Sequence, residues 1–212
     1  MAYLLNNPSE VATLLIQHIQ MTGITLLVAV LVAVPTALLI TRYRWLEIPV
    51  IGFLGILYTI PSLALIIFLL PFFGLGATSV IVAMVLYTQV ILVRNLTVGL
   101  AGISPAVLEA ARGMGMSQWQ RWWWVQVPLV LPVFIAGVRI AAIVAIAIAT
   151  IGAKFNAGGL GRLLFDGIQT NQLDKIWAGS IVVALLAFAM NGLLLWLEQK
   201  LNKQPLNKRG RT

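Results

Sequence analysis

Charged residues are scarce in this sequence. Only 9% of its 212 residues are charged and 60% are hydrophobic, whereas about 25% of the residues of a soluble domain are charged. Too few charged side chains are present to cover a surface that faces water. We therefore expect an all-α polytopic membrane protein. The formal net charge is +8, and the distribution of the positive residues is then expected to set the orientation in the membrane; no nucleic-acid partner is expected.

Cysteine is absent, and His18 is the only histidine. The first absence excludes disulfide bonds, cysteine-ligated metal sites and cysteine nucleophiles. A single histidine excludes bis-histidine haem ligation and histidine-rich metal sites. A Walker A sequence is also missing, so we expect a separate subunit to bind and hydrolyse ATP. In this chain itself we expect no catalytic residue, metal ion or cofactor.

Five segments are long and apolar enough to span a bilayer, which takes roughly 20 residues in a helix. They cover about residues 19–40, 48–73, 77–96, 129–151 and 177–197. Together they predict one transmembrane domain over residues 1–200. Trp177 and Trp196 bracket the fifth segment, a pattern typical of simple anchoring in the two interfacial belts.

Pro61 interrupts the second segment, and Pro71 lies near its end. A proline inside a helix removes one backbone hydrogen bond and bends the helix. Such a bend marks either a moving or cavity-lining helix or a packing kink that lipid-embedded helices tolerate. Under the first interpretation Tyr58, Pro61 and Ser62 are candidate pathway residues, because the two hydroxyl groups would offer polar contacts to a passing solute.

Lysine and arginine residues are distributed unevenly between the two sides of the predicted spans. Ten share one side: Arg42, Arg44, Arg94, Arg112, Arg121, Lys200, Lys203, Lys208, Arg209 and Arg211. Three lie on the other side, namely Lys154, Arg162 and Lys175. The positive-inside rule makes the richer side cytoplasmic. We therefore expect the N-terminus outside and the C-terminus inside, with residues 201–212 as a basic cytoplasmic tail.

Residues 104–127, on the expected cytoplasmic side, predict a short helix that glycines interrupt. Ser104 is a good N-cap, and Pro105 is a good first helical residue because its missing N–H costs nothing there. Gly113 and Gly115 would then break the helix.

A second short helix is expected after these glycines. Ser117, followed three positions later by Gln120, has the pattern of a capping box. We expect this helix to end near Pro128, where a proline can begin the next span. The simplest interpretation of the two helices is an interfacial amphipathic connector.

The same loop carries a spaced sequence pattern. It reads Glu109-Ala110-Ala111, three residues, Gly115, nine residues, Val125, one residue, Val127, Pro128. This pattern resembles the EAA loop of importer-type ABC permeases, written EAA-x3-G-x9-I-x-L-P, with valine at the isoleucine and leucine positions. In that family the loop docks into a cleft on a cytoplasmic ATPase. The resemblance implies a coupling role for five residues: Glu109, Ala110, Ala111, Gly115 and Pro128.

Glycines are also concentrated in the outer connection, residues 152–176. Irregular backbone at membrane depth is stable only where protein buries it or where it lines a watery cavity. Gly158, Gly159 and Gly161 are therefore candidate gate residues. The alternative is an ordinary glycine-rich turn before a short interfacial helix.

Three segments resemble one branch of these permeases. The branch is the permeases that import glycine betaine, choline or carnitine. The similar segments are Thr59-Ile60-Pro61-Ser62-Leu63-Ala64-Leu65, Ala136-Gly137-Val138-Arg139 and Gly158-Gly159-Leu160-Gly161. The methionine-type permeases share the Gly-Gly-Leu-Gly element, and the resemblance implies their type I importer fold. Lys154-Phe155-Asn156 departs from the branch, in which small residues are expected at these positions.

Arg139 lies inside the fourth predicted span. Arginine is costly at that depth, so its side chain is expected to face a cavity or a partner helix. The competing interpretation is that it snorkels to the inner interface. In a cavity its positive charge would attract a carboxylate, which favours a zwitterion such as betaine or carnitine over choline.

The resemblance implies the permease subunit of an ATP-driven importer in the bacterial inner membrane, which moves a quaternary-ammonium solute by alternating access. The implied partners are an ATPase dimer that binds ATP and Mg²⁺, a second permease chain in a homodimer or heterodimer, an extracytoplasmic substrate-binding protein, and membrane lipid. Two alternatives are a permease for methionine or another amino acid, and a non-transport structural subunit of a membrane complex.

Overall fold

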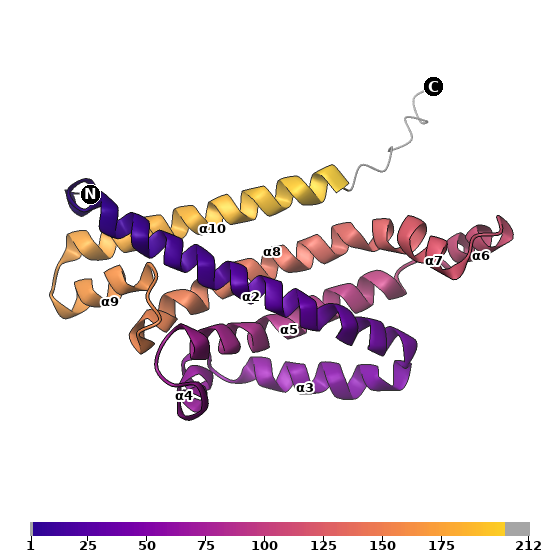
Figure 1. Cartoon of the computed structure of the whole chain (residues 1–212), viewed down its shortest axis with the longest axis horizontal. Helices are drawn as coiled ribbons and strands as arrows, with labels where there is room; N and C mark the ends of the chain where they lie inside the picture. Colours follow the sequence, from indigo (N-terminus) through magenta and orange to yellow (C-terminus); the bar gives the residue numbers. More distant parts are fainter. Residues whose placement is uncertain (1, 202–212) are drawn as a thin grey trace, which may run out of the picture.

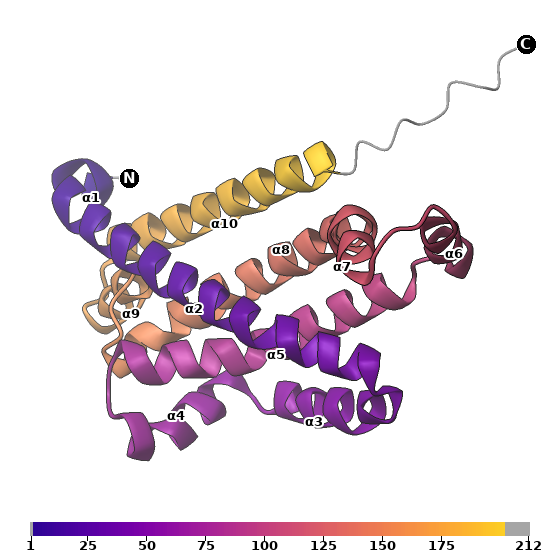
Figure 2. The ribbon, with the colours of Figure 1, turned by 45° about the vertical axis from the view of Figure 1, so that its right-hand side comes forward.

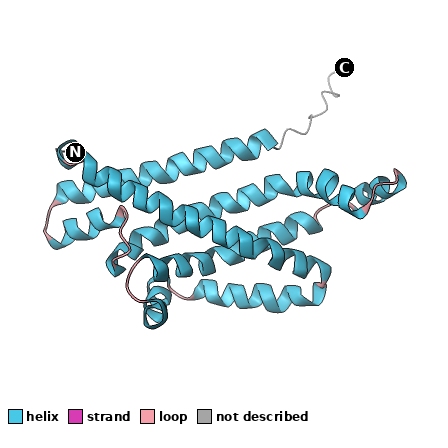
Figure 3. Cartoon of the chain, viewed as in Figure 1, coloured by secondary structure: helices cyan, strands magenta, loops and turns pink. Residues whose placement is uncertain are grey.

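The computed structural model describes residues 2–201; nearly all of these are helical, and none lies in a strand (Figure 3). Most of the expected basic tail, residues 202–212, lies outside this range. The α-helices are α1 (Ala2–Asn6), α2 (Pro8–Arg42), α3 (Glu47–Thr59), α4 (Ser62–Phe73), α5 (Ala77–Ala101), α6 (Pro105–Gly113), α7 (Gln118–Arg121), α8 (Val127–Gly152), α9 (Gly161–Gln169) and α10 (Leu173–Leu201). Short 3-10 helices cover Arg44–Leu46 and Ala153–Phe155, and a π-helical segment covers Trp122–Gln126.

Among the described residues, four helical segments are long and apolar enough to cross a membrane. They are α2, α5, the segment from α7 through α8, and α10. Helices α3 and α4 form a bent pair that makes a fifth span if its halves are taken together. The expectation of an all-α polytopic protein with about five spans is therefore confirmed.

The long helices run alongside one another, and the connecting segments gather at two ends (Figures 1 and 2). One end, here called the coupling end, carries α6, α7 and the corner between α2 and α3. The opposite end, here called the outer end, carries the N-terminus and α9. The two loops that the charge distribution assigns to the cytoplasm therefore lie at the same end of the bundle.

Helix α2 begins at Pro8, well before the start expected near residue 19. Its additional turns are stabilised by protein contacts: Val11 and Leu14 are buried together with Leu160 and part of α9. An apolar run marks only the part of a helix that lipid requires. Polar turns that continue the helix beyond the apolar run are not recognised when spans are predicted from hydrophobic residues alone.

The bend expected at Pro61 in the span over residues 48–73 is a complete break between two helices, because α3 and α4 meet at 99°. A proline pushes the preceding residue out of the helical region, and Ile60 and Pro61 both have extended backbone, with ψ of 127° and 132°. Two extended residues in succession end one helix and start another in a new direction. Pro61 therefore breaks the helix, and halves of 13 and 12 residues remain.

The second helix of the expected coupling loop does not end near Pro128. It continues through the π-helical segment into α8 and forms one helical segment over Gln118–Phe155. The N–H of Val127 still donates to the carbonyl of Trp122, five residues back. The π-helical hydrogen bonding therefore gives way to α-helical hydrogen bonding at Pro128, which has no backbone N–H to donate.

Small side chains allow α2 to lie directly against its neighbours. Ala29, Ala33 and Ala37 recur on one face of α2 and are fully buried in a cluster that includes Leu92 of α5. In lipid, close packing of this kind is a main source of helix association. Gln89 of α5 adds a hydrogen bond from Nε2 to the carbonyl of Ala29, at 3.1 Å.

The contact between α5 and α8 provides a test of this packing. A Cβ placed on Gly152 would lie 2.5 Å from Cγ1 of the buried Val80. We expect Gly152→Ala to destabilise the protein by about 1–3 kcal/mol, the usual cost of overpacking, in thermal unfolding of the purified protein. Gly192→Ala is the matched control, because nothing lies within 4 Å of its Cβ position. Equal melting temperatures for the two variants would contradict this account.

Candidate functional site

Helix α6 and the turn after it form the first half of the coupling segment, defined as residues 104–127. The helix begins directly after Ser104, with Pro105 in its first turn, as expected, although the Ser104 side chain makes no capping hydrogen bond. Glu109 and Ala110 are exposed, whereas Ala111 is buried. The helix therefore carries an acidic and a small side chain on its exposed face.

Gly115 ends this helix with a defined turn. Its N–H donates to the carbonyl of Arg112 at 2.9 Å, and the N–H of Met116 donates to the carbonyl of Ala111 at 3.2 Å. This hydrogen-bond pair is a Schellman motif, which requires a left-handed residue at the position of Gly115. Its φ is +77°, so a residue with a Cβ would be strained there.

The second half of the coupling segment starts with the expected capping box. The backbone N–H of Gln120 donates to Oγ of Ser117 at 3.2 Å, and the N–H of Ser117 donates to Oε1 of Gln120 at 2.7 Å. Arg121 donates from Nη1 to the carbonyl of Met116 at 2.8 Å and so ties this half back to the turn. Pro128 lies farther along, at the start of α8, where it lines a cavity of about 270 Å³ with Glu198.

The Gly-Gly-Leu-Gly turn at the outer end packs against α2. The N–H of Gly159 donates to Oε1 of Gln17 at 3.0 Å. Gly158 and Gly159 have φ of +80° and +78°, and a Cβ on Gly158 would lie 2.5 Å from the same Gln17 oxygen. A Cβ on Gly161 would collide with the carbonyl oxygen of Thr150. All three glycines are therefore required by backbone conformation or close approach.

The partners of this turn on α2 were not predicted from the sequence. His18 is fully buried, with Nε2 3.2 Å from the carbonyl oxygen of Ile146, and its Nδ1 lies 3.1 Å from the Cβ position of Gly159. Gln17 and His18 lie between the apolar Leu14–Ile16 run and Ile19, which is the signal that could have identified them. They join α2 to both the turn and α8.

Lys154, Phe155 and Asn156, the departure from the related branch, fit this turn through individual contacts. The Nζ of Lys154 lies 4.8 Å from the ring centroid of Phe165 in α9. Phe155 packs against the core cluster of α5 and α8. Asn156 has a left-handed backbone, with φ of +60°, which asparagine tolerates better than most residues.

The three candidate pathway residues of the second span lie at the break between α3 and α4. Pro61 directly precedes α4 and is exposed, Ser62 is half-buried, and the ring of Tyr58 lies 5.5 Å from that of Tyr87. Ile60 packs against the same core cluster as Ala157 of the outer connection. The helix break and the outer connection therefore share one part of the bundle.

Arg139, in contrast, faces a partner helix in the middle of α8. Its Nη2 lies 3.3 Å from Oε2 of Glu198, and its Nη1 donates to Oδ1 of Asn191 at 3.5 Å. Both partners belong to α10, and the two charged side chains are only 27% and 22% exposed. Because Glu198 offsets the charge, Arg139 offers little net attraction to the carboxylate of a solute. Sequence reasoning missed Glu198, although it is one of only six acidic residues in the chain.

A polar cavity of about 460 Å³ lies at the outer end of the protein. It is lined by Tyr3, Asn6, Asn7, Asn171, Gln172, Leu173, Asp174 and Lys175. The Tyr3 hydroxyl donates to Oε2 of Glu10 at 2.6 Å, and this hydrogen bond raises the pKa of Tyr3 to about 12. Lys175 in turn lies 3.7 Å from Asp166. The first helix and the start of α10 thus form one polar surface.

A bundle of apolar helices with an exposed helix-turn-helix at one end and a packed glycine turn at the other is the architecture that the sequence resemblance implies. The chain belongs to the family described as "Binding-protein-dependent transport system inner membrane component", whose model matches residues 26–203. The resemblance to ABC importer permeases is thereby confirmed, and so is the location in the inner membrane.

Individual relatives agree with this assignment. The chain is 38% identical to the osmoprotectant import permease protein OsmW of Salmonella typhimurium, over 91% of this chain and 92% of that protein. It is 32% identical to the glycine betaine/carnitine/choline transport system permease protein OpuCB of Bacillus subtilis, over 97% and 95%. Its fold matches a chain of the inward-facing MetNI methionine ABC transporter with a TM-score of 0.80, at 19% identity, over 93% of this chain and 99% of that chain. The expected methionine-permease-like fold is therefore confirmed.

The ion pair between α8 and α10 gives the next prediction. Removing either partner leaves the other charge without compensation, so we expect Arg139→Ala and Glu198→Ala each to lower stability and transport while the complex still assembles. The double variant should lose less stability than the sum of the two losses, with a coupling free energy on the order of 1–3 kcal/mol. Unfolding of the four proteins in detergent measures this coupling. Strictly additive losses would show that the pair contributes nothing, and Lys200→Ala controls for loss of charge on α10.

Proposed function

We propose that the chain is the membrane-spanning permease of an ATP-driven importer for quaternary-ammonium compatible solutes such as glycine betaine, carnitine and choline. The observation that carries this proposal is the identity of 32–38% along nearly the whole chain with permeases named for these solutes. The likeness to the methionine transporter supports the fold alone, because identity there is only 19%. The three shared sequence segments of the second span, α8 and the outer turn favour the same solute class.

ATP hydrolysis belongs to a partner in this proposal. The coupling segment projects from one end of the bundle (Figure 1), and its exposed Glu109 and Ala110 would enter a cleft on an ATPase dimer that binds ATP and Mg²⁺. That end is cytoplasmic under the positive-inside rule, which places the N-terminus outside. Movement of the paired coupling segments would reorient the spans between inward-facing and outward-facing states.

Two further partners complete the importer. A second permease chain, identical or similar, would pair with this one, since many large apolar side chains remain exposed along the helices. A substrate-binding protein would dock at the outer end, where the polar cavity beside Tyr3 and Lys175 offers a hydrogen-bonding surface. The break at Pro61 and the turn at Gly158, Gly159 and Gly161 would then act as pathway and gate elements, because both pack on the same part of the core.

Uptake of radiolabelled solutes tests the function. We expect cells that lack their own importers to take up glycine betaine, carnitine or choline when this chain is expressed with the ATPase and binding protein encoded beside it. Methionine, offered in parallel, should not enter. Uptake of methionine alone would keep the architecture and overturn the solute class, and a chain that never associates with an ATPase would instead be a structural subunit.

The Schellman turn allows a sharper test of coupling. We expect Gly115→Ala to reduce uptake and co-purification of the ATPase, because a left-handed alanine costs roughly 1–2 kcal/mol and the strain would distort the turn. Gly113→Ala is the matched control, since Gly113 is helical and nothing lies within 4 Å of its Cβ position. Equal ATPase recovery and uptake for the two variants would count against a coupling role for this turn.

A further inference from the structure

A groove lined by apolar side chains opens between α2 and the start of α8. It has a volume of about 390 Å³, and its lining includes Val34, Leu38, Trp122, Trp123, Val130 and Phe134. Helices α2, α5 and α8 pack closely around the buried alanines of α2; α2 and α8 then separate toward the coupling end (Figures 1 and 2). This groove is called the α2–α8 groove below.

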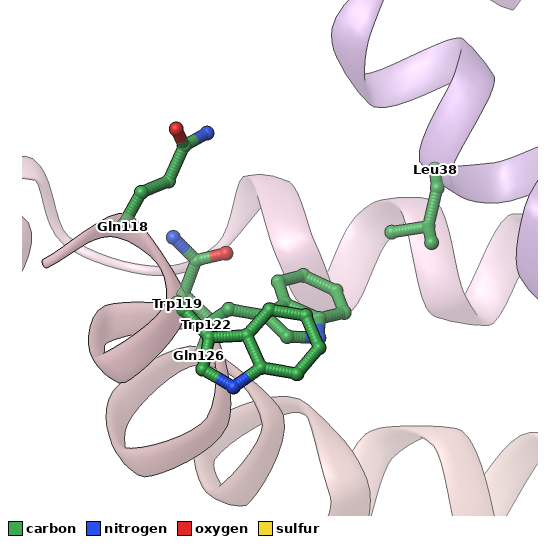
Figure 4. Close-up of a pocket in the computed structure, with 5 residues that line it drawn as sticks. All are labelled: Leu38, Gln118, Trp119, Trp122 and Gln126. Carbon is green, nitrogen blue, oxygen red and sulfur yellow. The ribbon is translucent and has the colours of Figure 1, made fainter.

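The groove continues into a second cavity that has polar groups at its mouth. This cavity, of about 480 Å³, is lined by Leu38, Gln118, Trp119, Trp122 and Gln126. Two of these residues, Leu38 and Trp122, also line the apolar groove. In Figure 4 Leu38 faces the indole rings across the cavity, and the amide of Gln118 lies at its far side. The combined space is therefore apolar at its inner end and hydrogen-bonding at its mouth.

The π-helical segment shapes this space. Five successive residues, Trp122–Gln126, have π-helical hydrogen bonding between α7 and α8. π-Helical turns are rare and occur frequently at functional sites. Here the segment supplies two of the tryptophans and one amide that line the two cavities. The coupling segment and the groove thus share the same residues.

Two arginines belong to the helical segments that line the mouth. Arg42 follows Leu38 by one helical turn, so Val34, Leu38 and Arg42 share one face of α2. Arg121 directly precedes Trp122 and is fixed by its hydrogen bond to the carbonyl of Met116. The guanidinium group of Arg42 lies 5.6 Å from the ring centroid of Tyr43, one residue beyond the helix face that it shares with Leu38. A basic side chain at the end of each helical segment that lines the mouth favours an anionic, hydrogen-bond-accepting head group and disfavours a quaternary ammonium ion.

We propose that the α2–α8 groove binds one anionic glycerophospholipid. One acyl chain fills the apolar groove, the ester groups accept hydrogen bonds from the amides of Gln118 and Gln126, and the phosphate lies beside Arg42. A solute that is wholly polar would leave the apolar groove empty, and a second permease chain would have to fill a space that narrows into the protein. The bound lipid holds α7 against α2 and so couples the lipid composition of the membrane to the position of the coupling segment.

Native mass spectrometry of the purified full-length chain, with the subunits that remain bound to it, tests the site directly. The probe is phosphatidylglycerol, with phosphatidylcholine as the neutral comparison. We expect one phosphatidylglycerol per permease chain to be retained and phosphatidylcholine to be lost at the same detergent concentration. Leu38→Trp fills the groove and should abolish retention. Leu31→Trp adds the same volume on the exposed face of α2, where Leu31 is 65% exposed, and should retain the lipid.

A second pair of variants tests the head-group contact without altering the groove. We expect Arg42→Gln to weaken phosphatidylglycerol retention about fivefold, the value of one basic side chain near an anionic lipid. Arg44→Gln removes an equal charge from the same corner but lies off the face shared with Leu38, and should have a much smaller effect. Because bound lipid is counted by mass, the outcome does not depend on which solute the importer carries.

Four results would overturn the proposal. Retention by Leu38→Trp equal to that of the unaltered protein would place the lipid elsewhere. Equal retention of phosphatidylcholine would show an unselective apolar surface. Displacement of the lipid by millimolar glycine betaine would assign the groove to the solute. Separation of paired permease chains by Leu38→Trp, with the lipid count unchanged, would assign the groove to a second chain.

Discussion

Close contact between α2 and its neighbours α5 and α8 controls both ends of the molecule. Because Ala29, Ala33 and Ala37 carry the smallest side chain that still has a Cβ, the helix backbones approach closely there, and α2 crosses the others obliquely (Figure 2). At the outer end, Gln17 reaches across and bonds the glycine turn. At the coupling end, Leu38 and the first turns of α8 line a groove. Helix α2 therefore bonds the glycine turn on one side of this contact and lines the apolar groove on the other.

Much of the fold follows from local chemistry that the sequence shows directly. Apolar runs locate every span, and the cap at Ser117 and the glycine at position 115 give the turns of the coupling segment as found. What could not be predicted depends on contacts between distant residues. The outer turns of α2 are helical because α9 covers them. The π-helical hydrogen bonding before Pro128 has no signature in apolar periodicity.

The candidate functional residues could be selected from the sequence, but their contacts with distant residues could not be predicted. Each glycine of the outer turn could be singled out because glycine clusters are visible in a sequence, but their partner Gln17 lies more than a hundred positions away, in α2. Arg139 could be recognised by its cost in lipid, whereas its ion pair depends on the antiparallel packing of α8 and α10. The residue type shows that a charged side chain is costly to place in lipid. Only the fold shows which side chain offsets its charge.

This compensation bears on how the solute is selected. An uncompensated arginine in the pathway would hold a carboxylate strongly, and a solute that binds too tightly within a membrane leaves too slowly. The pairing of Arg139 with Glu198 at 3.3 Å removes that attraction. A permease whose family depends on a binding protein does not need a tight site of its own, because capture and discrimination can occur before the solute reaches the membrane. Under the proposed function, the naming of one relative for betaine, carnitine and choline together fits a pathway that is permissive toward the acidic group and leaves its recognition to a binding protein.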